Sequence, residues 1–93
     1  MNEPNAQALS PVDLSSFLIS LAQSALVHLG EVPDPGTGQR GTQLTLARYT
    51  IDTLAMLEEK TKGNLDEQES KLLGSLLDEL RLKYVDVSSR QGR

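Results

Sequence analysis

The chain has 93 residues, of which 38% are hydrophobic and 24% charged, a balance typical of a globular protein and unlike that of a disordered one. Its net charge of −4 disfavours nucleic acid as the main partner, because nucleic-acid binding needs a basic surface. The absence of cysteine excludes disulfides and thiolate chemistry. We therefore expect one small cytoplasmic domain.

The N-terminal segment 1–9 is polar and unpatterned, and we expect it to be disordered. It lacks the basic start and the apolar run of a secretory signal. The most apolar stretch, residues 14–29, contains several serines and is shorter than the roughly 20 apolar residues that a membrane span requires. The sequence therefore predicts neither a signal peptide nor membrane attachment.

A first helix is predicted over residues 11–29. Ser10 resembles a helix cap, Pro11 suits the first helical position, and Gly30 is a typical stop. At 100° per residue, the apolar side chains of this helix cover roughly 200° of its circumference, about twice the width of an ordinary apolar stripe. Such a helix is expected to pack against its own chain on one side and against another protein on the other.

The segment 31–41 is rich in proline and glycine and is predicted to be a loop. Within it, residues 36–41 (GTGQRG) match the GxGxxG pattern of dinucleotide-binding turns. That function requires a strand before the pattern, whereas here a helix precedes it. We interpret the segment as a plain loop and expect no cofactor.

A second helix is predicted over residues 43–61 and a third over residues 67–85, from apolar residues that recur at helical spacing. A turn at Gly63 separates the two helices, and Asp66 supplies a cap for the third. A connection this short predicts an antiparallel hairpin.

The polar tail 86–93 is expected to be flexible, and residues 10–85 to form a single helical domain. The expected fold is all-α, with three helices packed into an oligomeric bundle. Oligomerisation is expected because so small a core, without disulfides or a metal site, commonly needs additional contacts for stability.

Four stretches of the sequence suggest a family. They are residues 17–30 (FLISLAQSALVHLG), 32–35 (VPDP), 51–54 (IDTL) and 59–65 (EKTKGNL). Together they resemble the bacterial domain-of-unknown-function family numbered 1844, over about residues 14–85. The resemblance implies a bacterial source and a small helical domain, and it supplies no catalytic residues.

The residues that could carry chemistry do not form a catalytic set. His28 is the only histidine and falls within the apolar arc of the first helix, so it is either packed at the helix end or a pH-sensitive interface contact. Asp52 is expected to pair with Arg48 one helical turn away. Without a base beside a nucleophile, we expect no enzymatic activity, no metal, and no small-molecule substrate.

The sequence instead predicts a protein–protein interaction module that associates with itself. Its candidate core and interface residues are Leu14, Phe17, Leu18, Leu21, Leu72, Leu76 and Leu80. The turn with Lys60, Lys62 and Asn64 is either structural or a partner contact. Two alternatives stay open at this point: an adaptor for a different protein, and a nucleic-acid accessory. The accessory would use the basic residues Lys60, Lys62, Arg81, Lys83, Arg90 and Arg93.

Overall fold

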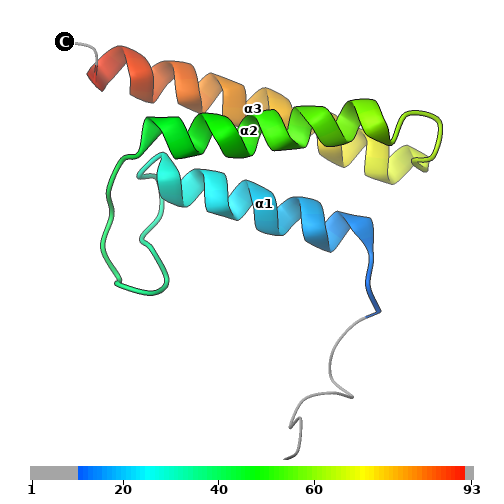
Figure 1. Ribbon diagram of the computed structural model, residues 1–93, viewed down its shortest axis with the longest axis horizontal. Coiled ribbons are helices and arrows are strands. Elements are labelled where there is room, and N and C mark those ends of the chain that lie inside the picture. The colour runs from blue at the N-terminus through cyan, green and yellow to red at the C-terminus, as the bar shows by residue number, and fades with distance from the viewer. Residues whose placement is uncertain (1–10, 92–93) are drawn as a thin grey trace, which may run out of the picture.

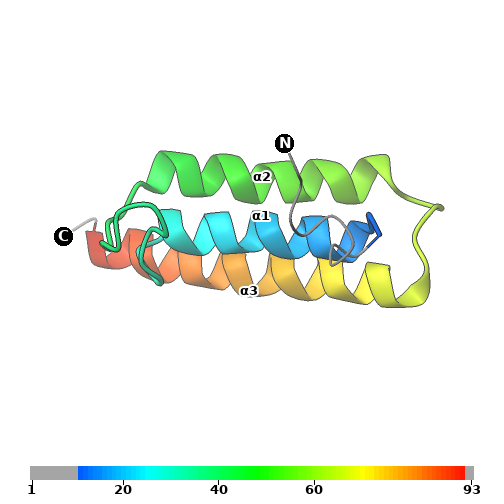
Figure 2. The ribbon, with the colours of Figure 1, turned by 90° about the horizontal axis from the view of Figure 1, so that it is seen from below.

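The computed structural model describes residues 11–91, which form three helices and no strand. They are α1 (Leu14–His28), α2 (Leu44–Lys60) and α3 (Glu67–Gln91). Figure 1 shows that α2 runs opposite to α1 and α3, and each helix contacts the other two. Seen from below in Figure 2, α1 lies over the seam between α2 and α3. The predicted all-α fold and the antiparallel hairpin of the second and third helices are confirmed.

The first helix begins three residues later than predicted. The backbone of Asp13 is extended, and its side chain accepts a hydrogen bond from the amide of Ser16 at 2.7 Å. Because Asp13 caps the helix, Pro11 stays outside it, and the predicted start at residue 11 is wrong. Ser10 and the segment 1–9 lie outside the described residues. At the other end Gly30 has a φ of 78°, the left-handed conformation that follows many helices.

The connection between α2 and α3 is held by local hydrogen bonds. Gly63 adopts a φ of 85° just after α2. The amide of Glu69 donates to Asp66 Oδ1 at 2.8 Å, and the amide of Asp66 donates to Glu69 Oε1 at 2.9 Å. This reciprocal pair satisfies two amides at the start of α3. The turn is therefore tight, and α2 and α3 pack along their lengths.

The third helix is longer than predicted, because it continues beyond residue 85 to Gln91. Val87 is only 4% exposed, and it extends the buried stripe of the helix by two turns from Leu80. Arg90 and Asp86, one turn apart, form an ion pair at 3.0 Å. The predicted helix end at residue 85 is therefore wrong, since Val87 beyond it is buried in the core. The flexibility of the tail stays a prediction. Residues 92–93 lie outside the described residues.

The core lies between the three helices and consists of aliphatic side chains. Its buried members are Leu18, Ala22, Ala25, Leu29, Ala47, Ile51, Leu54, Leu73, Leu77, Leu80 and Val87. One polar residue, Thr50, is also buried, and its hydroxyl donates to the carbonyl of Leu46 at 3.0 Å. The three alanines of this core lie on α1 and α2, whereas α3 contributes only leucines and Val87.

Candidate protein interaction surface

The structure divides the candidate interface residues between the core and the surface. Leu18 and Leu80 are buried in the core. The partly buried candidates that pack against it are Leu14, Leu21, Leu72 and Leu76. Phe17 differs from all of these, because it is 50% exposed. Among the predicted candidates, Phe17 is therefore the residue most available to a partner.

Charge is distributed very unevenly among the helices. The fifteen residues of α1 include no Asp, Glu, Lys or Arg. Its outward positions carry small or neutral polar side chains, such as Ser20 and Gln23. By contrast, α3 begins with Glu67 and Glu69 and carries charges along its whole length. A surface that includes α1 is thus unusually poor in charge for a small protein with a net charge of −4.

The side chains of α2 divide into two flanks. Arg48, Ile51 and Asp52 line a small cavity shared with Arg81, Tyr84 and Val85 of α3, so this flank faces α3. The predicted pair of Arg48 and Asp52 is present, with Nε and Oδ2 3.8 Å apart. Positions half a circumference away lie on the opposite flank, towards α1. The members of that flank are Leu46, Thr53 and Leu57.

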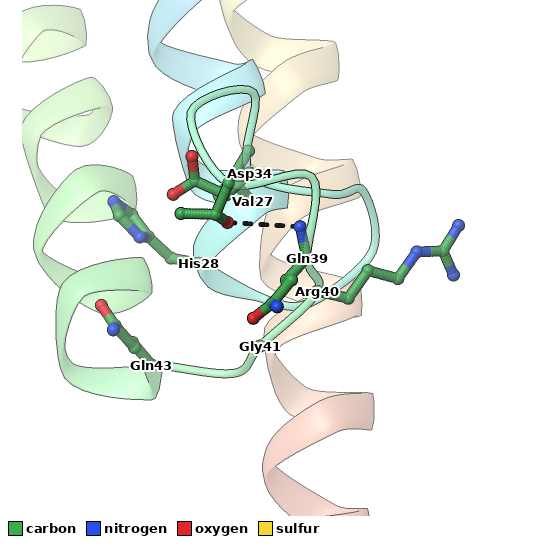
Figure 3. A pocket seen from close by; sticks show the side chains of 8 residues that line it. Val27, His28, Asp34, Gln39, Arg40, Gly41 and Gln43 are labelled. Carbon is green, nitrogen blue, oxygen red and sulfur yellow. Dashed lines mark hydrogen bonds between the residues drawn. The ribbon is translucent and has the colours of Figure 1, made fainter.

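His28 identifies the corresponding flank of α1. Its carbonyl accepts a hydrogen bond from the amide of Gln43 at 2.7 Å, and in Figure 3 its ring points towards α2. Phe17, Leu21 and Ser24 precede it at helical spacing and share its stripe. The other flank of α1 faces α3, where Lys83 lies 3.5 Å from Glu31 at the end of the helix.

These two flanks form one continuous surface, which we name the α1–α2 face. It is defined by Phe17, Ser24, Leu46 and Thr53, together with Tyr49 and Met56, which lie between Thr53 and Asp52 on the outer side of α2. Phe17, Leu46 and Met56 are each about half exposed, and Tyr49 is 73% exposed. Along the two stripes, the described residues that can carry a positive charge and lie nearest to this surface are His28 at one end and Lys60 at the other. Depletion of charge combined with exposed aromatic and Met side chains is typical of the centre of a protein interface.

Two hydroxyl groups on and beside this surface donate within the chain. Thr53 donates its hydroxyl hydrogen to the carbonyl of Tyr49 at 2.8 Å, and Ser20 donates to the carbonyl of Phe17 at 2.8 Å. A hydroxyl that already donates within its own helix needs no donor bond to water or to a partner. At Ser20 and Thr53, cover by an apolar surface therefore leaves no donor unsatisfied.

A hollow of about 320 Å³ lies at the edge of this face, where the loop after α1 bends back over the helix. Its lining residues are Ser20, Gln23, Ser24, Val27, His28, Asp34 and Pro35. The loop is held in shape by Asp34, whose carbonyl accepts from the amide of Gly38 at 2.7 Å and whose carboxylate accepts from the amide of Gly36 at 2.6 Å. These bonds fix the local conformation of the loop beside the hollow.

The GxGxxG segment forms part of this loop. A second cavity of about 280 Å³, shown in Figure 3, lies between the segment and His28. Arg40 points away from that cavity, and the amide of Gln39 donates to Thr37 Oγ1 at 3.2 Å. The segment follows a helix and a turn rather than a strand, which agrees with its interpretation as a loop.

The turn with Lys60, Lys62 and Asn64 is explained by local contacts. Lys62 Nζ lies 3.4 Å from Glu59 Oε2, and the amide of Asn64 donates to the carbonyl of Thr61 at 2.9 Å. Ion pairs also engage Lys83 and Arg90, two further members of the basic set considered for nucleic acid. Arg93 lies outside the described residues. A partner contact at this turn stays a prediction.

Within residues 11–91, no three His, Cys, Asp or Glu side chains come close enough together to hold a metal ion. Over the same range, every helix is too short or too polar to cross a membrane.

Tyr49 and Met56 are surface residues that the sequence did not identify. They lie outside the apolar stripe of α2, so periodicity alone gives them no role. The available signal was the lack of charged residues between Asp52 and Glu58 and along all of α1.

The fold and this surface define a small three-helix protein with a partly apolar face that is poor in charge. The chain belongs to the family described as domain of unknown function (DUF1844), whose model matches residues 11–86. The matched range includes α1, α2 and most of α3, and it confirms the resemblance seen in the sequence. No curated protein and no solved structure matches the chain.

Proposed function

We propose that this chain is a non-catalytic protein–protein interaction module that self-associates through the α1–α2 face. The observation that carries the proposal is the exposure of Phe17, Leu46, Tyr49 and Met56 on a surface whose α1 half contains no Asp, Glu, Lys or Arg. Contiguous exposed apolar side chains on a small soluble protein mark a site of interaction. Burying them against a partner removes this apolar area from water.

Charge favours a second copy as the partner. An uncharged face is best matched by another uncharged face, since burying an unpaired charge against it costs free energy. Two copies joined through their α1–α2 faces leave both α3 helices, with their Glu, Asp, Lys and Arg residues, in water. Such a contact uses the same residues on both copies and closes with a two-fold axis.

The area of the face suits a dimer of modest affinity. Helices α1 and α2 have 15 and 17 residues. At 1.5 Å per residue and about 10 Å between axes, they present a projected area of about 450 Å². Because side chains protrude from the helices, the accessible area exceeds the projected area and approaches the roughly 600–800 Å² per partner of a small to standard interface. We expect dissociation in the micromolar range, so the protein concentration must be varied in the test.

The test compares two substitutions at equally exposed positions. Tyr49 on the α1–α2 face and Leu82 on α3 are both 73% exposed. Light scattering from about 1 to 100 μM, a range that brackets micromolar affinity, should show the molar mass rising from 10.1 kDa towards twice that value. Tyr49→Glu should keep the mass at that of a monomer, because it buries a charge in the contact. Leu82→Glu should behave as the unchanged protein.

Two results would contradict the proposal. A helical monomer at every concentration would mean that the face is not self-complementary and that a different protein covers it. An equal loss of association in Tyr49→Glu and Leu82→Glu would mean that the contact lies elsewhere or that charge acts generally. Circular dichroism of both variants checks that the helices are intact.

A further inference from the structure

The hollow beside α1 is continuous with the α1–α2 face. Ser24 and His28 line the hollow and also belong to the stripe of α1 that faces α2. Val27 and Pro35 contribute apolar walls, on the helix and on the loop. An apolar cavity of about 150 Å³ is enough to hold benzene. At about 320 Å³, the hollow has room for a phenyl ring together with its link to the backbone.

Phe17 is the ring best placed to fill such a hollow. It is the single phenylalanine of the chain, it is 50% exposed, and it projects from the same stripe as Ser24. Aromatic side chains that insert into a pocket are typical anchors of protein interfaces. The nearest lining residue, Ser20, lies one helical turn after Phe17, but Phe17 does not line the hollow of its own copy. A helical side chain leans towards the N-terminus of its helix, so the Phe17 ring is directed away from that hollow.

A two-fold axis between two copies can bring the Phe17 of each copy to the hollow of the other. The midpoint between Phe17 and Ser24 falls at Ser20, whose side chain is small and exposed. If the axis passes near Ser20, two antiparallel α1 helices bring each Phe17 to the Ser24 of the other copy. A parallel pair would instead place Phe17 against Phe17 and leave both hollows empty.

We propose that Phe17 of each copy inserts into the hollow between α1 and Pro35 of the other copy, so that the two α1 helices pair antiparallel about Ser20. This inference rests on the proposed self-association and specifies how it occurs. Each copy completes the site of the other, since the hollow is lined by one chain and filled by the other. Phe17→Ala should therefore weaken the dimer about 30-fold or more, as expected for an aromatic anchor.

The direct test uses the single phenylalanine as a label. A mixture of copies labelled only at phenylalanine and unlabelled copies is examined by isotope-filtered nuclear Overhauser spectroscopy. Within one copy, Phe17 and Val27 are about 15 Å apart along α1, too far for a cross-peak. A cross-peak from the Phe17 ring to the Val27 methyl groups must therefore come from two copies, and we expect to observe it.

Cysteine substitutions test the direction of the helices, because the chain has no cysteine of its own. Ser20→Cys should form a disulfide with its counterpart across the axis. Ser16→Cys should not, since its two copies would be about 13 Å apart, beyond the reach of a disulfide. Equal cross-linking of both variants would indicate parallel helices and overturn the inference.

The outcomes separate the two proposals. A dimer by light scattering that lacks the Phe17–Val27 cross-peak overturns the insertion of Phe17 and leaves self-association standing. A monomer at all concentrations overturns both.

Discussion

Replacing Val87 by Ala should lower the free energy of unfolding by about 1–2 kcal/mol. Val87 is 4% exposed, so the substitution removes two buried carbon groups at about 0.8 kcal/mol each and leaves a small cavity. The higher helix propensity of Ala offsets about 0.5 kcal/mol of this loss. Since about 1 kcal/mol shifts the Tm of a domain this size by roughly 4–8 °C, thermal unfolding followed by circular dichroism should show a clear decrease.

Val85, two residues earlier in α3, provides a matched control. It is 65% exposed, so Val85→Ala removes little buried area, and the propensity of Ala should leave stability unchanged or raise it by up to about 0.5 kcal/mol. Both positions lie outside the α1–α2 face, so neither change should alter the molar mass. Equal effects of the two substitutions would refute the packing of the last turns of α3 against the core.

Two further predictions concern the helix ends and the glycines, and the same unfolding measurements check them. Asp13→Ala should cost about 1 kcal/mol by removing the acceptor for the Ser16 amide, whereas Asp13→Asn, which keeps an acceptor, should cost much less. A loss as large in Asp13→Asn would contradict the capping role. Gly63→Ala should destabilise by about 1 kcal/mol because its φ is 85°. Gly74→Ala, inside α3 with open space around the new methyl group, should instead stabilise by about 0.5–1 kcal/mol, and effects of the same sign would contradict this reasoning.

Local signals were sufficient to predict the three helices and their hairpin. The left-handed Gly63 and the capping pair of Asp66 and Glu69 act within a few residues of sequence, so the sequence alone indicates them. The start of α1 was less certain, because Ser10 and Asp13 are both good caps. Choosing between them needs the position of the helix relative to the core.

The end of α3 could not be predicted from polarity. From residue 86 the sequence is mostly polar, and Val87 is an isolated apolar residue. Its burial depends on contacts with other helices, which the local sequence does not contain. Tertiary packing therefore stabilises helical turns that the polar composition of this segment did not predict.

The exposure of the candidate interface residues was predicted only in outline. The wide apolar arc of α1 correctly indicated more apolar surface than one contact needs, because Phe17 stays half exposed. A helical projection gives the angle between two side chains but not the direction in which the neighbouring helices lie. The sequence therefore could not show which of the neighbouring residues Phe17 and Leu18 is buried in the core.

In the proposed dimer, the scarcity of charge on the α1–α2 face would also determine how quickly two copies associate. Long-range attraction can raise association rates to about 10⁸–10⁹ M⁻¹s⁻¹, whereas contacts without it form at about 10⁵–10⁶ M⁻¹s⁻¹. Encounter at this face depends on diffusion and chance orientation, and substitutions within it change mainly the lifetime of the complex. Added salt, which weakens complexes held by opposite charges, reduces the mutual repulsion of two copies with net charge −4 and leaves their contact intact.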